Sequence, residues 1–193
     1  MVQLKKSINY WSFPGGSEAT KDVRKHMREA KEFGFDAIEL CLSERGDVSV
    51  ESSNRELENL AKDAKGIGIE ISSLASGLLW SSSPTSGDAA VRTKARDIVR
   101  KQIEAASALG TDAILVIPGA VDVFFMPGGE VVPYDRVHER LRDAVQEVLP
   151  YAEKFKVAIG LENVWNKFFL SPLEARDFID YFKSKYVGIF FDT

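Results

Sequence analysis

The stretch ALGTDAILVIPG, residues 108–119, decides the fold. In it a glycine follows a helical pattern and comes just before a short, nearly continuous apolar run, AILVI. Glycine suits the end of a helix, where the backbone needs a left-handed conformation. A run of this kind is typical of a strand that is buried on both faces of a parallel sheet. The stretch therefore predicts a helix that leads within a few residues into a buried strand.

The same unit recurs along the chain. KEFGFDAIELCLS at residues 31–43 and KGIGIEISSLASG at 65–77 also place glycine before an apolar run. VAIGL at 157–161 and VGIFF at 187–191 add two runs, and SINYW at 7–11 is an earlier candidate. Helical patterns with one apolar face separate these six predicted strands. The order is therefore β-α repeated five times and then a sixth strand, in a single domain over residues 1–193 without linkers.

Alternation of this kind predicts a parallel sheet with helices outside it, either doubly wound or closed into a (β/α) TIM-type barrel. The turn after the first strand lacks the GxGxxG pattern of a dinucleotide-binding fold, and the sequence contains no GxxxxGK[ST] phosphate loop. Long polar and aromatic segments follow two strands, GLLWSSSPTSGD at 77–88 and PGAVDVFFMPGGEVVPYD at 118–135. Because barrels build their sites from such loops, we expect an α/β barrel.

A complete barrel has eight strands, so the sequence predicts a barrel that is truncated after the sixth strand. The chain reaches the sixth apolar run and ends there, which favours a fragment of a longer gene product. Pairing with another copy of the chain and an open sheet are the two alternatives, because an unclosed barrel leaves the edges of its first and last strands unpaired.

Composition narrows the class of protein. The chain has 193 residues, of which 45% are hydrophobic, and a formal net charge of -4, with Lys and Arg scattered along helix faces. We therefore expect no nucleic-acid partner. Cys41 is the only cysteine, which excludes an internal disulfide and fits a reducing compartment. We recognise no signal peptide and no run of the roughly 20 apolar residues that a membrane helix needs, so we expect a cytoplasmic protein without a membrane partner.

Two carboxylates follow apolar runs in consecutive predicted strands. Glu162 ends the fifth run and Asp192 follows the sixth. Neighbouring strands lie roughly 4.8 Å apart, so both carboxylates could reach one divalent metal. Oxygen ligands suit Mg²⁺ or Mn²⁺, and an added imidazole would extend the choice to Co²⁺ or Zn²⁺. The alternatives are an ion pair between Glu162 and a neighbouring Lys or Arg, and simple solvation of Asp192.

Five further residues are candidates for substrate binding. Glu39 occupies a place on the second strand comparable to that of Glu162, where it could bond to the substrate or steady the barrel mouth. Trp11, Trp80 and Trp165 all follow strands, and aromatic rings commonly wall the pocket of a small polar ligand. Ordinary packing at the barrel rim is their alternative. Asn163 could donate to the hydroxyl groups of a substrate or cap the turn that follows.

With these features in place, the sequence resembles the xylose isomerase-like barrels, specifically the sugar phosphate isomerase/epimerase group. The segments GLENVWNKFFLSPLEARDFID at 160–180 and VGIFFDT at 187–193 are similar to its fifth- and sixth-strand motifs. GFDAIEL at 34–40 is similar to its second-strand motif, and VIPGAV at 116–121 and VPYDRV at 132–137 to its fourth loop. The likeness runs through the whole chain and reaches the first three-quarters of the family barrel.

The resemblance implies a divalent metal bound near the mouth by two carboxylates, a His and another Glu. Glu162 would match the first Glu, which also serves as acid/base, and Asp192 would match the Asp. The His and the second Glu come from later strands, which this sequence lacks. The implied chemistry is isomerisation or epimerisation of a ketose sugar or sugar phosphate, by proton removal next to a metal-polarised carbonyl. Family likeness and exposed edges are also compatible with a homo-oligomer.

Two other functions stay open at this point. A zinc-dependent apurinic endonuclease on the same fold needs a cluster of His ligands and a basic DNA face, whereas His26 and His138 lie inside helical patterns and the net charge is negative. A non-catalytic barrel fragment, which binds without turnover, is the second alternative, since the last strands are absent.

Overall fold

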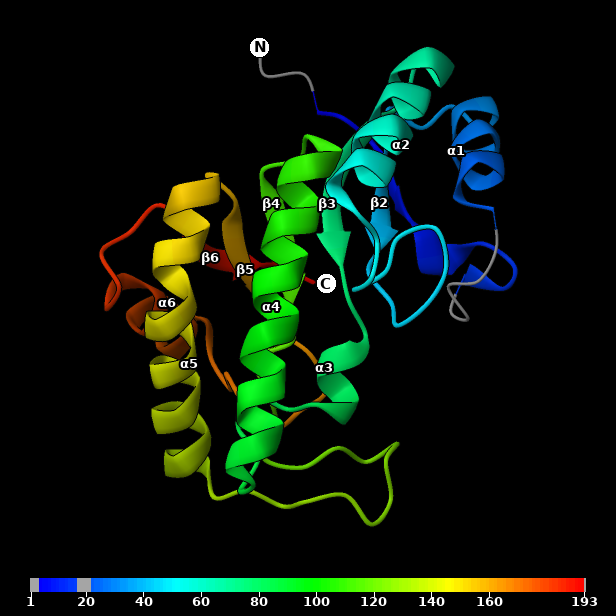
Figure 1. Cartoon of the computed structure of the whole chain (residues 1–193). Coiled ribbons are helices and arrows are strands. Elements are labelled where there is room, and N and C mark those ends of the chain that lie inside the picture. The colour runs from blue at the N-terminus through cyan, green and yellow to red at the C-terminus, as the bar shows by residue number, and fades with distance from the viewer. Residues whose placement is uncertain (1–3, 17–21, 193) are drawn as a thin grey trace.

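A computed structural model describes residues 4–16 and 22–192; Thr193, the last residue of the VGIFFDT motif, lies outside the described residues. One parallel sheet forms the centre (Figure 1). Its strands are β1 (Ser7–Asn9), β2 (Ala37–Cys41), β3 (Glu70–Ala75), β4 (Ala113–Val116), β5 (Ala158–Glu162) and β6 (Val187–Phe190). The helices are the 3-10 helix η1 (Tyr10–Ser12), α1 (Val23–Glu32), α2 (Asn54–Ile67), α3 (Leu78–Ser81), α4 (Ala89–Leu109), α5 (Tyr134–Phe155) and α6 (Pro172–Asp180).

The strands lie in the sheet in the order in which they occur in the chain, and all neighbouring strands are parallel. Helices α1, α2, α4 and α5 contact one another in the same order, and Figure 1 shows α4 and α5 in front of the sheet. A doubly wound sheet reverses its strand order where the helices change face. Right-handed crossovers without such a reversal keep the helices on one side, which is the winding of a barrel. The predicted (β/α) barrel winding is therefore confirmed over six strands.

The glycines end their helices as predicted. Gly68 and Gly110 are the C-cap residues of α2 and α4 and have φ values of 80° and 77°. Gly34, which follows α1, has a φ of 81°. Residues with a Cβ atom rarely adopt this left-handed conformation, which glycine adopts readily. Each glycine therefore fixes the point where a helix ends and the chain turns toward the next strand.

The first predicted strand is shorter than SINYW suggested, because the chain leaves the sheet after Asn9. The Asn9 side-chain Oδ1 accepts a hydrogen bond from the backbone N of Trp11 (2.7 Å) and so caps the helix η1. The expectation of a strand over residues 10–11 is therefore wrong: a local side-chain hydrogen bond offers the backbone an alternative to the ladder.

The main core lies between the sheet and the helices. Several strand side chains are fully buried there, including Ile38, Leu40, Leu74, Ile114, Ile159 and Leu161. They belong to the same hydrophobic cluster as residues on the apolar faces of the helices, including Met27, Leu57, Leu60, Val137, Leu141 and Phe178. Full burial of one such side chain contributes roughly 1.5–3 kcal/mol. Among the helices of the described ranges, none is both long and apolar enough to cross a membrane.

A side chain reinforces the junction between β3 and β4. Leu74 and Ile114 form the one register pair recorded for these strands within the described residues. Gln102 of α4, which is 0% exposed, donates through Nε2 to the carbonyl oxygens of Leu74 (2.7 Å) and Leu115 (2.9 Å). Because these carbonyls lie near the strand ends, Gln102 helps to fix where the loops after β3 and β4 begin.

Candidate functional site

A buried carboxylate joins the first three strands on the inner face of the sheet. Glu39 is 6% exposed, and its register neighbours are Asn9 on β1 and Ser73 on β3. Asn9 donates through Nδ2 to Glu39 Oε2, and Ser73 donates through Oγ to Oε1 (2.7 Å). Burial raises the pKa of Glu39, and the two hydrogen bonds partly oppose that rise. Both carboxylate oxygens of Glu39 therefore accept hydrogen bonds from the neighbouring strands.

Glu162 is the last residue of β5, and its side chain is half-buried beside β6. Its register partner is Phe190, whose ring occupies the space above Gly160. A Cβ atom at Gly160 would lie 3.1 Å from Phe190 Cβ, so glycine is what allows this close approach. Within residues 4–16 and 22–192, no hydrogen bond or ion pair of the Glu162 carboxylate is found, and the ion pair with Lys or Arg considered from the sequence is not formed there.

The electrostatic surroundings of Glu162 favour its protonated form. Its pKa is raised to about 7, first by burial and then by the negative charges of Asp192 and Glu39. An unpaired carboxylate that loses water is destabilised when ionised, and neighbouring like charges add to that cost. Glu162 and Asp192 lie at the same edge of the sheet, because Glu162 pairs with Phe190 and the next residue, Asn163, binds the backbone of Asp192.

Asn163 holds the residues after β5 and β6 together. Its Nδ2 donates to the backbone O of Asp192 (2.7 Å), and its Oδ1 accepts from the backbone N of Asp192 (2.9 Å). The Asn163 side chain thus extends the hydrogen bonding between β5 and β6 beyond their last register pair, Glu162 with Phe190. Asn163 was predicted to bind substrate; in the structure both ends of its amide bind the backbone of Asp192.

The residues at this edge fit part of a cation site. Glu162 and Asp192 offer oxygen ligands, which Mg²⁺ and Mn²⁺ prefer, and a cation beside them would offset the repulsion that raises the Glu162 pKa. Within the described part of the chain, no group of three or more His, Cys, Asp and Glu side chains is placed to hold a metal ion. The two carboxylates therefore provide an incomplete coordination sphere.

The three tryptophans lie in different surroundings. Trp11 is half-buried and packs against the core. Trp80, in α3, lines a cavity and meets the ring of Phe125 edge-on at 5.1 Å between ring centroids. Trp165 is 77% exposed, and its ring centroid lies 6.3 Å from that of Phe124. Trp80 thus forms part of the wall of a cavity.

A buried amide ties the loop after β4 to the loop after β5. Asn166 is 0% exposed; its Nδ2 donates to the backbone O of Gly119 (2.7 Å), and its Oδ1 accepts from the backbone N of Phe168 (3.1 Å). Its own carbonyl accepts from the backbone N of Val121 (2.9 Å). Asn166 therefore acts as a clamp between the two loops.

Sequence reasoning missed Asn9, Ser73 and Gln102 as residues that shape this region. Asn9 and Ser73 are polar residues inside predicted strands, and Gln102 lies among the apolar residues of a helix face. A polar side chain at a position expected to be buried is a signal that a hydrogen-bond partner exists. The identity of the partner depends on strand register, which the sequence does not display.

Comparisons with known proteins agree with the barrel fold. The profile of a family described as xylose isomerase-like TIM barrel matches residues 27–193. The structure of a D-psicose 3-epimerase from Clostridium cellulolyticum H10, solved with D-tagatose, has a TM-score of 0.79 at 19% identity over 98% of this chain and 63% of its own. For an L-ribulose 3-epimerase these values are 0.76, 19%, 99% and 61%.

A third structure is a xylose isomerase-like TIM barrel protein from Mycobacterium smegmatis in complex with magnesium. It has a TM-score of 0.61 at 18% identity, over 96% of this chain and 63% of its own. At these identities the likeness to the three structures shows the fold, and the chain spans less than two thirds of the length of each. Among curated proteins, no sequence match is found.

Proposed function

Because this chain belongs to the xylose isomerase-like TIM barrel family, we propose that the protein isomerises or epimerises a ketose sugar or sugar phosphate. Two of the structures that share its fold are ketose 3-epimerases, which supports this class of substrate. Since the chain spans 63% and 61% of their lengths, the activity is proposed for the intact protein. In this proposal residues 1–193 form one incomplete barrel domain.

The observation that carries the proposal is the state of Glu162. A general base works best when its pKa lies near the operating pH, because it must both accept and release a proton. The half-buried Glu162 carboxylate stands at the carboxyl end of a barrel strand, where barrel enzymes place their chemistry, and before a cation binds its pKa is raised to about 7. The carboxylate is thus suited to proton transfer on a bound substrate.

Glu162 takes the proton from the carbon next to the substrate carbonyl and returns it as an acid. Return to the neighbouring carbon, together with transfer of the hydroxyl proton to the former carbonyl oxygen, moves the carbonyl along the sugar, which is isomerisation. Inversion at the same carbon needs a second acid/base group on the opposite face. A divalent cation would be held by Glu162 and Asp192 and would polarise the carbonyl. The oxygen ligands favour Mg²⁺ or Mn²⁺, and an added imidazole would extend the choice to Co²⁺ or Zn²⁺.

The other predicted residues take supporting roles. Trp11 and Trp80 wall the substrate, and Trp165 stands at the outer rim. Glu39 contributes negative charge beside Glu162, which is supported by its effect in raising the Glu162 pKa. Its hydrogen bonds to Asn9 and Ser73 support a second role, in which it joins three strands.

The test is exchange of deuterium from D₂O into sugars. The intact protein is incubated with Mn²⁺ and a panel of ketoses and ketose phosphates, and deuterium at the carbon next to the carbonyl is measured by NMR. Glu162→Gln should lower the rate at least about 100-fold, because the general base is lost. Glu70→Gln is the matched control: Glu70 starts β3 at the other end of the barrel and pairs with Lys5 (2.6 Å). Exchange into no sugar, or an equal loss in both variants, would overturn the proposal.

A further inference from the structure

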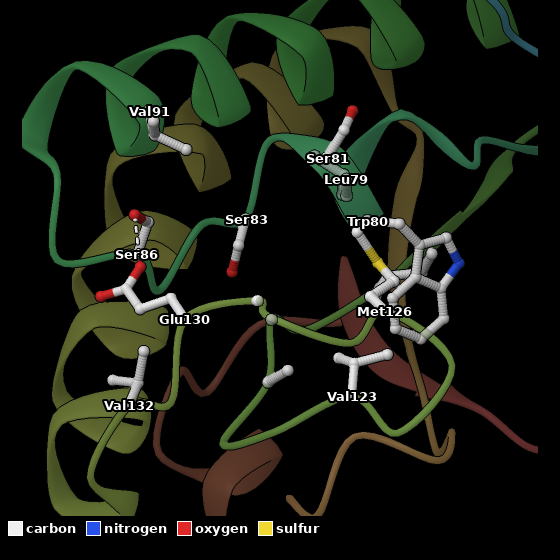
Figure 2. Close-up of a pocket in the computed structure, with 14 residues that line it drawn as sticks. Leu79, Trp80, Ser81, Ser83, Ser86, Val91, Val123, Met126, Glu130 and Val132 are labelled. Atoms are coloured by element: carbon white, nitrogen blue, oxygen red, sulfur yellow. Dashed lines mark hydrogen bonds between the residues drawn. The ribbon is translucent and has the colours of Figure 1, made fainter.

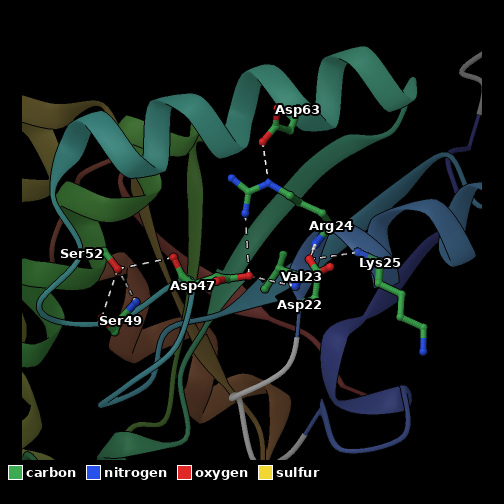
Figure 3. A network of polar contacts seen from close by, with 8 residues as sticks. All are labelled: Asp22, Val23, Arg24, Lys25, Asp47, Ser49, Ser52 and Asp63. Carbon is green, nitrogen blue, oxygen red and sulfur yellow. Dashed lines mark hydrogen bonds and ion pairs between the residues drawn. The ribbon is translucent and has the colours of Figure 1, made fainter.

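A cavity of about 260 Å³ opens between the loops that follow β3 and β4 (Figure 2). Trp80 of α3 lines it from the first loop, and Ile117 lines it from the second. Ile117 directly follows Val116, whose register partner Leu161 directly precedes Glu162. The cavity therefore reaches the same edge of the sheet as Glu162, one strand away.

Polar groups occupy one side of this cavity and are fixed in place. The Glu130 carboxylate accepts hydrogen bonds from Ser86 Oγ (2.8 Å) and from the backbone N of Gly87 (2.6 Å). Figure 2 shows the Ser83 side chain pointing into the space between Glu130 and Met126. A carboxylate and a hydroxyl on one side thus face apolar atoms on the other, which is the mixed lining of a small-molecule site.

A row of aromatic rings leads from the cavity toward the loop after Glu162. The centroids are 5.1 Å apart for Trp80 and Phe125, 5.3 Å for Phe125 and Phe124, and 6.3 Å for Phe124 and Trp165. Phe124 is 70% exposed and Trp165 is 77% exposed. Contiguous exposed apolar surface of this kind marks a place where a ligand or partner binds.

We propose that the cavity binds a second sugar ring joined to the reacting ketose, so that the substrate is a glycosylated ketose instead of a free monosaccharide. This inference rests on the proposed function. The volume of about 260 Å³ is slightly below the roughly 300–1,000 Å³ of pockets for drug-sized ligands, and so suits one ring. Trp80 covers the C–H face of that ring, while Ser83 and Glu130 bind hydroxyl groups at its edge.

The test compares fructose with a set of glucosyl-fructoses that differ in linkage position. Deuterium exchange by the intact protein gives kcat/KM for each sugar, and at least one glucosyl-fructose should exceed fructose about tenfold. Val91→Phe and Ser83→Met, which fill the cavity, should lower the ratio of the two kcat/KM values at least tenfold. Val91 is included because its side chain has no hydrogen bond to lose. Ser107→Met, on the exposed surface of α4, should leave the ratio unchanged.

The outcomes separate this inference from the proposed function. If fructose exchanges deuterium but no glucosyl-fructose reacts faster, or if the folded Val91→Phe protein keeps the original ratio, the second-ring site is wrong and the proposed function stands. If no sugar exchanges, the proposed function fails, and binding of methyl glucoside decides the inference. Saturation-transfer NMR signals that are present in the unmodified protein and lost in Val91→Phe support the site, and their absence overturns it.

Discussion

Replacing Gln102 by leucine tests how the two strands beneath the cavity loops are held. The Nε2 group of this fully buried side chain donates to the carbonyl oxygens of Leu74 (2.7 Å) and Leu115 (2.9 Å). Leucine has a similar volume but offers no donor. The substitution therefore leaves both carbonyls without this partner while it changes the packing little.

The expected magnitude follows from counting buried polar atoms. A buried carbonyl that loses its donor costs about 1–3 kcal/mol, so two carbonyls cost about 2–6 kcal/mol. Gln102 Oε1 is itself buried without a hydrogen-bond partner among the described residues, and leucine removes that penalty of about 1–3 kcal/mol. The net loss in the free energy of unfolding is then roughly 2 kcal/mol, which for a chain of this size lowers Tm by about 4–8 °C.

Urea unfolding followed by circular dichroism measures this loss. Gln146→Leu is the matched control, because Gln146 is exposed on α5 and its Nε2 donates only to the hydroxyl of Tyr181 (3.1 Å) among the residues described. The control should change stability by less than about 0.5 kcal/mol. If the two variants are equally stable, the carbonyls of β3 and β4 find other donors and the role given to Gln102 is refuted.

Two further predictions concern β5. The pKa of Glu162 is raised from 4.5 to about 7, so the folded chain binds more protons than the unfolded chain in this window, and the free energy of unfolding falls as pH rises through it. With allowance for solvent screening, we expect the free energy of unfolding, measured by urea at the two ends of this window, to fall by about 1–2 kcal/mol. Mn²⁺ should reverse this fall, and Glu162→Gln should not show it. The same pH dependence in that variant would contradict the prediction. Gly160→Ala should cost about 1–3 kcal/mol in thermal unfolding, because the new Cβ would lie 3.1 Å from Phe190 Cβ, whereas Gly188→Ala, with no atom within 4 Å, should be nearly neutral. Equal effects at the two glycines would disprove the packing argument.

Much of the fold could be predicted from the sequence because two local signals agree. Gly68 and Gly110 stand where the backbone must turn left-handed, and the runs that follow them are buried strands. The failure over residues 10–11 has the opposite cause. There, apolar and aromatic composition favours a strand, but the Asn9 side chain caps a helix η1 instead. The short helix α3, inside the loop after β3, also lacked any periodic pattern long enough to reveal it.

The site could be predicted only in part, because register decides which side chains meet. Glu162 is recognisable as a charge that ends an apolar run. The partners of Glu39 are not recognisable in this way, since the register between β2 and β3 shifts between Ile38 and Glu39. That irregularity places Ser73, rather than Ser72, opposite Glu39. One shifted residue thus selects the hydroxyl that binds the carboxylate, and no local pattern records it.

Asn166 constrains how the rim of this barrel can evolve. A side chain without access to water must keep its hydrogen bonds, and those of Asn166 reach Gly119 in one loop and Phe168 in its own. An insertion or deletion in either segment that moves one of these backbone groups would leave the amide in the interior without its hydrogen-bond partner. The two segments beside the clamp can therefore diversify only as a matched pair.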